Sequence, residues 1–401
     1  MHAWEAVMSG GRELALRGGS LFLPGQRVAE ADVFIADGRI AAIGAPPTDW
    51  NPSAARIDAS GQFVAPGFID IHHHGAAGHG VGEADEAALA GIARFRATTG
   101  CTSLLASFVD WPENVERVVR CWEAVNESAE QLARFAGVHF EGPFLSKNMP
   151  GAIDPDRILD PDPVLLDELL DAAGGWARVM TVAPDAEHSL VLFARLRDRG
   201  VVAAIGHSNA SYERALEAVD AGATHTTHSF NAMSGLHHRA PGVAGAMLTD
   251  GRLTGEVIAD GVHVHPAAIR ILLRAKGFHE VAAITDGIAL TGMSEGDYAR
   301  PNGRRVRVDA ESVRLENGTL AGSRSTLDRN VRNLVKLAGL RPEEAASMAS
   351  EVPARIAGLI KDRGTLEQGK LADIVVLSSE LNVQLTLVGG REAFRRPDFG
   401  G

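Results

Sequence analysis

The stretch FVAPGFIDIHHHG, residues Phe63 to Gly75, is an apolar run that ends in three consecutive histidines. Side chains of a β-strand alternate between its two faces, so His72 and His74 should point together and His73 to the other side. Imidazoles that share a face can bind the same metal ion. The stretch therefore predicts a strand whose carboxyl end carries the two metal ligands His72 and His74, with His73 outside the site.

Strand-like runs and helix-like segments alternate through the middle of the chain. Helix-like segments such as 112–135 and 209–222 separate most of the strand-like runs. Eight alternating units predict a parallel (β/α)8 barrel, a TIM-like fold of the α/β class. The eight runs are residues 63–74, 101–109, 135–142, 177–185, 200–208, 223–231, 252–264 and 280–287.

Shorter strand-like pieces separated by glycine turns lie on both sides of this region. Residues 14–44 contain such pieces with an Asp-Gly turn, and residues 364–390 repeat the pattern near the other end. These turns are typical of hairpins. We therefore expect residues 64–363 to form the barrel, and residues 1–63 and 364–401 to form one small β-sandwich beside it.

Composition narrows the class of protein. The 401 residues carry a formal net charge of -12, which argues against nucleic-acid binding, because such proteins need a concentrated basic face. No run of 18 apolar residues and no signal-peptide pattern occurs, so we expect a cytoplasmic protein without membrane contact. The two cysteines, Cys101 and Cys121, form no CxxC motif and predict neither a disulfide framework nor a thiolate zinc site.

Ionisable residues recur at the carboxyl ends of the strand-like runs, which is where barrel enzymes place their active sites. A lone histidine at such a position is more often a hydrogen-bonded structural residue, and a lone glutamate an ion-pair partner. The joint pattern favours a metal site, because buried ionisable groups need a common partner. The residues are His72, His74, Glu141, His207, His228 and Asp286.

Five other histidines are expected to be structural. They include His225, which precedes His228 by three residues and should face the opposite side of its strand. His238 is left without a role. The structural group is His73, His79, His188, His225 and His237.

Several motifs resemble a known group of enzymes. PGFIDIHHHG, the eighth-run TDG and EQGKLADIVVL resemble the amidohydrolase superfamily of metal-dependent barrel hydrolases. GVHFEGPF, IGHSNASYERALEAVDAGATHTTHSFNAM, HHRAPGVAGA, VIADGVHV and LAGSRSTLDRNVRNLV resemble, more narrowly, the N-acetylglucosamine-6-phosphate deacetylase family. The resemblance runs over nearly the whole chain, and the ordered set of motifs is highly specific.

The resemblance implies a role for each strand-end residue. Glu141, His207 and His228 would hold the metal found throughout the family. His72 and His74 match a pair that some members have, and would hold a second metal with Glu141 as the bridge. One or two divalent metals per subunit are therefore expected, with zinc ahead of iron, manganese or cobalt.

The resemblance also implies a reaction and its substrate contacts. Asp286 would act as general base and then general acid on a metal-activated water, releasing acetate from N-acetylglucosamine-6-phosphate. The substrate contacts would be Asn231, Ala232 and Arg239 near the phosphate and His263 at the sugar. Related enzymes are homodimers, so a homodimer is expected.

One position departs from the family pattern. After EGPFLS the family continues into KGAH, whose histidine helps to orient the acetyl carbonyl, whereas this chain reads KNMPGAIDP with Ile153 in that place. Isoleucine neither donates a hydrogen bond nor titrates. The sequence therefore leaves room for N-acetylgalactosamine-6-phosphate or an N-acyl amino acid as the substrate.

Two further alternatives are weaker. Dihydropyrimidinase-like and dihydroorotase-like enzymes bridge their metals with a lysine of the fourth strand, and the run 177–185 contains none. A non-catalytic scaffold would be expected to lose ligands or the eighth-strand aspartate, and all six candidates are present here.

Overall fold

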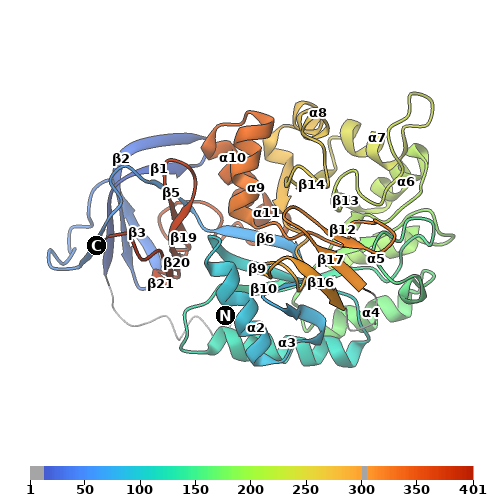
Figure 1. The fold of residues 1–401 in the computed structure, drawn as a ribbon, viewed down its shortest axis with the longest axis horizontal. Helices are drawn as coiled ribbons and strands as arrows, with labels where there is room; N and C mark the ends of the chain where they lie inside the picture. The colour runs from blue at the N-terminus through green and yellow to red at the C-terminus, as the bar shows by residue number, and fades with distance from the viewer. Residues whose placement is uncertain (1–12, 300–304, 401) are drawn as a thin grey trace.

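The structure is a computed structural model that describes residues 13–299 and 305–400. Its centre is a sheet of eight parallel strands ordered β6-β9-β10-β11-β12-β13-β14-β15 (Figure 1). The sheet closes because Asp286 N donates to His72 O over 2.9 Å, beside a parallel bridge between His73 and Gly287. The predicted (β/α)8 barrel is confirmed. Its strands are β6 (Phe68–His73), β9 (Cys101–Phe108), β10 (Arg134–Glu141), β11 (Ala177–Val182), β12 (Val202–Ile205), β13 (Ala223–Thr226), β14 (Thr254–Ile258) and β15 (Val281–Ile284).

Helices surround this barrel (Figure 1). Several begin at capping residues that the sequence displays: Asp85 accepts from Ala88 N at the start of α2, and Ser211 accepts from Arg214 N at the start of α6. The helices are α2 (Glu86–Ala97), α3 (Pro112–Glu127), α4 (Pro163–Ala172), α5 (Leu190–Asp198), α6 (Tyr212–Ala221), α7 (Gly242–Thr249), α8 (Pro266–Lys276), α9 (Leu327–Asn333), α10 (Pro342–Ala349) and α11 (Glu351–Ile356). Short helical turns are η1 (Val81–Glu83), η2 (Pro155–Arg157), η3 (Phe278–Glu280) and η4 (Leu334–Ala338). No helix in the described ranges has the length and hydropathy needed to cross a membrane.

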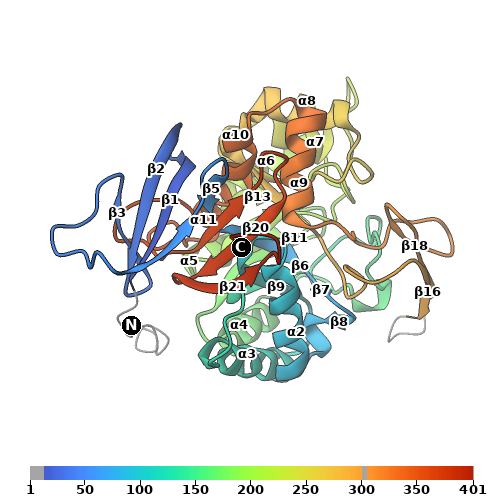
Figure 2. The same cartoon turned by 60° about the vertical axis from the view of Figure 1, so that its left-hand side comes forward.

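A second eight-stranded sheet joins the two ends of the described chain (Figures 1 and 2). Its continuous order is β21-β20-β19-β5-β1-β2-β3, with β4 paired to β1, so the expected association of early and late segments is confirmed. The division of the chain at residues 63 and 363 stays a prediction. The strands are β1 (Leu14–Leu23), β2 (Gln26–Ala36), β3 (Arg39–Ile43), β4 (Ala55–Asp58), β5 (Phe63–Pro66), β19 (Ile374–Leu377), β20 (Val383–Val388) and β21 (Arg391–Arg395).

The expected single strand 63–74 is instead two strands. β5 pairs with β1 and β19 in the terminal sheet, and the barrel strand β6 starts only after Gly67. A side chain at Gly67 would place its Cβ 2.3 Å from the side chain of Thr102, so the chain can pass from one sheet to the other only with glycine at this close approach.

A smaller antiparallel sheet lies on the other side of the barrel from β1–β3 (Figure 2). Val306, Val313 and Leu315 of this sheet pack with Ala152 and Ile288, which belong to loops that follow barrel strands. The sheet therefore packs on the end of the barrel where the strands finish. It consists of β16 (Gly296–Ala299), β17 (Arg305–Val308) and β18 (Val313–Leu315), and the hairpin β7 (Gly75–Ala76) and β8 (His79–Gly80) follows β6.

The closing seam of the barrel depends on a buried carboxylate. Asp70 accepts hydrogen bonds from Thr285 N at 3.2 Å and Thr285 Oγ1 at 2.5 Å, and lies 3.4 Å from the guanidinium of Arg96 on α2. Asp70 is fully buried and Arg96 is 1% exposed. The first strand, the last strand and the first helix are therefore joined through one side chain.

We expect Asp70→Ala to lower the free energy of unfolding by about 3–5 kcal/mol, because it leaves the Arg96 guanidinium buried without its carboxylate. Guanidinium chloride unfolding followed by circular dichroism measures the change. The matched control is Asp198→Ala, which removes an exposed partner of Arg197 and should leave the midpoint unchanged. Equal effects of the two substitutions would contradict the assignment.

Candidate metal centre

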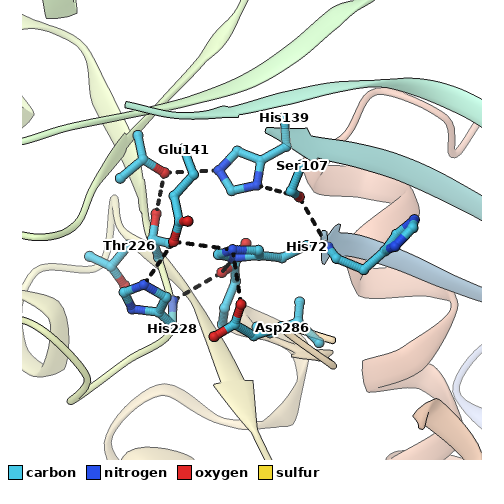
Figure 3. Close-up of polar contacts among 12 residues, drawn as sticks. His72, Ser107, His139, Glu141, Thr226, His228 and Asp286 are labelled. Atoms are coloured by element: carbon cyan, nitrogen blue, oxygen red, sulfur yellow. Dashed lines mark hydrogen bonds and ion pairs between the residues drawn. The ribbon is translucent and has the colours of Figure 1, made fainter. Parts of the chain in front are cut away.

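The six strand-end residues meet at the carboxyl-terminal mouth of the barrel. Figure 3 shows His72, Glu141, His228 and Asp286 pointing toward one another from different elements. His207 and Asp286 each lie two residues beyond the end of their strand. The predicted convergence of His72, His74, Glu141, His207, His228 and Asp286 is therefore present in the contacts of the structure.

Three of these residues have a positive φ, a backbone conformation that residues with a Cβ rarely adopt. φ is +45° at His207, +27° at His228 and +48° at Asp286. Each such conformation costs on the order of 1–3 kcal/mol and persists only where the surroundings impose it. The chain turns sharply at these points, and each turn brings a polar side chain to the mouth.

One group of donors is centred on Glu141 Oε1. His207 Nε2 lies 3.2 Å and His228 Nε2 3.1 Å from this oxygen, and the two nitrogens are 3.0 Å apart. His207 Nδ1 donates to the carbonyl of Met149 at 2.9 Å. A histidine that donates from Nδ1 presents its Nε2 as a ligand atom.

The second group contacts both oxygens of the same carboxylate. His74 Nε2 lies 3.2 Å from Glu141 Oε2, and His72 Nε2 lies 3.3 Å from Glu141 Oε1 and 3.3 Å from His74 Nε2. Asp286 Oδ1 is 3.3 Å from His74 Nε2 and 3.7 Å from His72 Nε2. Glu141 is thus shared by both groups, as a bridging ligand would be.

Simple alternation of side chains along β6 does not explain how His72 and His74 come to point to the same place. Ile69 and Ile71 belong to the buried cluster inside the barrel, and the pairing of β6 with β9 shifts register between Asp70 and His73. His72 reaches the interior directly after Ile71 because of this irregularity. His72 Nε2 and His74 Nε2 lie 3.3 Å apart, and neither ring nitrogen of His73 has a hydrogen-bond partner among the described residues. The assignment of His72 and His74 as metal ligands stays a prediction.

The donor set fits a divalent cation. Imidazole lone pairs directed at a carboxylate repel it unless a proton or a metal ion lies between them. Burial opposes charge here, but Glu141 and Asp286 raise the pKa of His74 to about 9. Likewise, burial opposes ionisation of Glu141, while His72 and His74 and hydrogen bonds from the other histidines hold its pKa well below its usual range. The negative charges of Glu141 and Asp286, which retain protons on the histidines, also favour a metal cation. Binding of that cation would displace the protons from the histidines.

Asp286 is ionised in this surrounding. Burial raises its pKa, but the hydrogen bond with His74 and the charges of His72 and His74 outweigh that effect and lower the pKa below its ordinary value. An ionised carboxylate at the edge of the ligand groups can accept a proton.

Sequence reasoning missed Glu256 of β14. Its side chain is fully buried and accepts from His72 Nδ1 at 3.0 Å, His225 Nε2 at 3.1 Å and His228 N at 2.9 Å. Burial opposes its charge, but His72 and His225 hold its pKa well below the usual range. An acidic residue inside an otherwise apolar strand-like run was the available signal, because a buried charge requires partners.

The expectation that His225 faces away from His228 is wrong. The pairing of β12 with β13 shifts register between Ala203 and Ala204, and His225 lies beside the inward-facing Ala204. Its ring consequently reaches Glu256, the same carboxylate that accepts from the backbone of His228.

The buried His139 packs against His72 outside the ligand groups. The ring of His139 packs edge-on against His72, with centroids 4.4 Å apart, and its two nitrogens bond Ser107 Oγ and Thr181 Oγ1 (Figure 3). Burial and the nearby His72 hold the pKa of His139 well below the ordinary range, so this ring is neutral. It fixes the position of His72 without adding charge.

Five other histidines in the described part of the chain lie outside the ligand groups. His73 is buried, neither ring nitrogen has a hydrogen-bond partner among the described residues, and burial with the charge of Arg96 lowers its pKa well below the usual range. His188 is exposed and lies 3.6 Å from Glu187. The ring of His237 packs at a tilt against that of His238, with centroids 4.2 Å apart, and His79 lies at the hairpin of β7 and β8.

The residues expected to contact the substrate lie in two segments. His263 follows β14, and the other three follow β13. The side chain of His263 is 5% exposed, its Nδ1 bonds Asp260 Oδ2 at 2.7 Å, and its Nε2 has no partner within the described ranges. Asn231 donates to the carbonyls of His228 and Ser229. Ala232 has a φ of +46°, and Arg239 is exposed with its Nη1 2.6 Å from His238 Nε2.

The loop that carries the departure from the family pattern approaches the centre. A Cβ at Gly151 would lie 3.2 Å from His207 Cε1 and 3.6 Å from Ala232 Cβ. Ile153 follows two residues later, half-buried, with its N donating to Pro150 O at 3.0 Å.

Comparison with known proteins agrees with this geometry. The amidohydrolase family model matches residues 63–393. N-acetylglucosamine-6-phosphate deacetylase of Bacillus subtilis (strain 168) is 34% identical over 367 residues, covering 90% of this chain and 92% of the relative. N-acetylgalactosamine-6-phosphate deacetylase of Escherichia coli O157:H7 is 36% identical over 364 residues, covering 90% of this chain and 93% of the relative.

Solved structures show the same relationship. An N-acetyl-D-glucosamine-6-phosphate deacetylase mutant from Mycobacterium smegmatis, in complex with N-acetyl-D-glucosamine-6-phosphate, is 34% identical with a TM-score of 0.86, covering 96% of this chain and 100% of that chain. This protein belongs to the amidohydrolase family, whose members are metal-dependent barrel hydrolases. The two groups of histidines around Glu141 are where this chain can hold a divalent metal.

We expect the stabilisation from the His263–Asp260 pair to depend on pH. Burial lowers the pKa of His263, but the bond to Asp260 outweighs it, so the folded-state pKa is raised above the unfolded value of about 6.5. The charged contribution is therefore complete below about pH 6.5 and lost as pH rises through the folded pKa. His263→Gln should cost about 1.5–3 kcal/mol at pH 6 and less at pH 9.

Thermal and denaturant unfolding at the two pH values measure this difference. His279→Gln, at an exposed position, is the matched control and should change stability equally little at both. A loss for His263→Gln that does not vary with pH would contradict the expected ion pair.

Proposed function

We propose that this protein hydrolyses the N-acetyl group of N-acetylglucosamine-6-phosphate, releasing acetate and glucosamine-6-phosphate. The observation that carries the proposal is Asp286, whose Oδ1 lies within 3.3 Å of His74 beside two ligand groups that share Glu141. The relatives that act on N-acetylated amino sugar phosphates cover nine-tenths of the chain, which supports this substrate class.

The chemistry divides between a bound metal and the residues of the chain. A divalent metal lowers the pKa of a water molecule and polarises an amide carbonyl. His72, His74, Glu141, His207 and His228 would hold it. Asp286, already ionised, would take the proton from the attacking water and deliver it to the departing sugar nitrogen.

Two groups support a phosphorylated sugar as the substrate. Arg239 is exposed and makes no salt bridge with any acidic residue in the described part of the chain, so its guanidinium is available to a phosphate. His263 offers a buried Nε2 to a sugar hydroxyl while Asp260 holds its other nitrogen. Asn231 and Ala232 would complete the phosphate side.

The finer properties of the centre and the assembly belong to the same proposal. We propose two metals per subunit, with zinc preferred over iron, manganese or cobalt, because both groups combine imidazole and carboxylate ligands. We also propose a cytoplasmic homodimer. The free thiols Cys101 and Cys121 support a reducing compartment.

We expect acetate release from N-acetylglucosamine-6-phosphate by protein whose metal content has been quantified. The comparison substrates are N-acetylgalactosamine-6-phosphate and unphosphorylated N-acetylglucosamine, measured by kcat/KM. Faster turnover of the phosphorylated glucosamine supports the proposal and shows that Ile153 is compatible with it. Preference for the galactosamine epimer, or no turnover with metal bound, would refute the substrate.

Asp286→Asn should lower kcat by about 100- to 10,000-fold, because the amide cannot accept the proton from water. Metal content, measured by mass spectrometry of the purified protein, should stay close to that of the wild type. Asp297→Asn, at an exposed position of β16, is the matched control and should retain full kcat. An Asp286→Asn variant with near wild-type kcat would exclude Asp286 as the general base.

A further inference from the structure

The structure contains a buried acid that the proposed chemistry does not use. Glu256 is fully buried in β14, and its Oε2 contacts His72 of one group of candidate ligands and the backbone of His228 of the other. We propose that Glu256 is a positioning residue that sets His72 for metal binding. This inference rests on the metal centre of the proposed function.

Glu256 determines which nitrogen of His72 faces the centre. Its Oε2 accepts from His72 Nδ1 at 3.0 Å, so the proton of a neutral His72 is held on Nδ1. The opposite nitrogen, Nε2, then carries the lone pair and lies 3.3 Å from Glu141 Oε1 and 3.3 Å from His74 Nε2. A carboxylate behind a ligand histidine fixes the ring orientation and makes the ligand more basic.

The same carboxylate reaches the other group through the backbone. Oε2 also accepts from His228 N at 2.9 Å, at the residue whose φ is +27°. The ring nitrogen Nδ1 of His228 has no partner among the described residues. The backbone contact with Glu256 therefore restrains His228 where no hydrogen bond of Nδ1 does. Glu256 thereby ties the ring of His72 to the turn that presents His228.

His225 holds Glu256 in turn. Its Nε2 lies 3.1 Å from Glu256 Oε1, and its Nδ1 lies 2.6 Å from Thr254 Oγ1 on the same strand as Glu256. Both oxygens of Glu256 are therefore engaged. The chain of contacts runs from the half-buried Thr254 through His225 and Glu256 to His72, and the last three are fully buried.

The contrast with His207 shows what Glu256 adds. The Nδ1 of His207 is held by the neutral carbonyl of Met149, whereas that of His72 is held by a carboxylate. Hydrogen bonds to an ionised acceptor are about twice as strong as those to a neutral one. Removing Glu256 should therefore weaken metal binding mainly through His72.

The test measures Zn²⁺ affinity on chelator-stripped protein by competition with a chromophoric chelator. We expect Glu256→Ala to weaken the Zn²⁺ affinity that depends on His72 by about 10- to 100-fold. Glu256→Gln, which retains one acceptor and the side-chain volume, should fall between wild type and Glu256→Ala. Far-ultraviolet circular dichroism of each stripped protein confirms that it is folded.

A double-mutant cycle separates positioning from a general structural role. If Glu256 acts through His72, the variant carrying both His72→Ala and Glu256→Ala should bind Zn²⁺ within about twofold of His72→Ala alone. Asp373→Ala is the matched control: it removes another buried carboxylate, which accepts from Gly389 N at 2.8 Å in the terminal sheet. It should lower the melting temperature and leave Zn²⁺ affinity unchanged.

Any of three results would overturn the inference. Glu256→Ala could leave the Zn²⁺ affinity unchanged, or the effects of Glu256→Ala and His72→Ala could be independent and additive. The third result is a His72→Ala variant that binds Zn²⁺ as tightly as the wild type. None of these readouts involves the sugar substrate. Coupled Zn²⁺ binding without acetate release would therefore refute the proposed substrate and leave the role of Glu256 intact.

Discussion

The carboxylate of Glu141 is the point on which the rest of the centre depends. It is buried at the mouth of the barrel, and its two oxygens together lie within 3.3 Å of nitrogens from four histidines. A buried carboxylate is costly unless it is paired, and imidazoles that surround it are ligands only when a cation lies among them. One acidic side chain thus defines where positive charge must be placed. The four histidines are His72, His74, His207 and His228.

The barrel supplies these partners from the ends of three strands, β6, β12 and β13. Parallel strands end at the same rim, so residues that follow different strands meet there although they are far apart in sequence. Positive φ values at His207, His228 and Asp286 then turn each side chain toward the centre. Such strained turns persist because closure of the barrel and the contacts of the side chains together outweigh their cost. The fold therefore stores strain where the chemistry requires a particular direction.

The charge of the whole molecule opposes the charge of the proposed substrate. The chain carries a formal net charge of -12, and an amino sugar phosphate is an anion. At physiological ionic strength, charges further apart than about 8 Å are largely screened, so local groups decide binding. Metal cations held at Glu141, the exposed guanidinium of Arg239 and a protonated His263 would supply local positive charge. Global acidity and an anionic substrate are thus compatible.

The sequence by itself determined the type and order of the chemistry-bearing residues. Alternation of strand and helix predicted the barrel, and ionisable residues at the ends of five of the eight strand-like runs predicted which side chains would meet, because both depend on local periodicity. The separation of β5 from β6 and the buried position of Glu256 were decided by tertiary structure. The chain passes from β5 to β6 at Gly67, where Thr102 of a neighbouring strand leaves no space for a Cβ. Glu256 meets His72 across 184 residues of sequence, and shifts in strand register bring His225 to the same carboxylate. Register and long-range contact arise from pairing and packing between strands, which the pattern within a single segment does not contain.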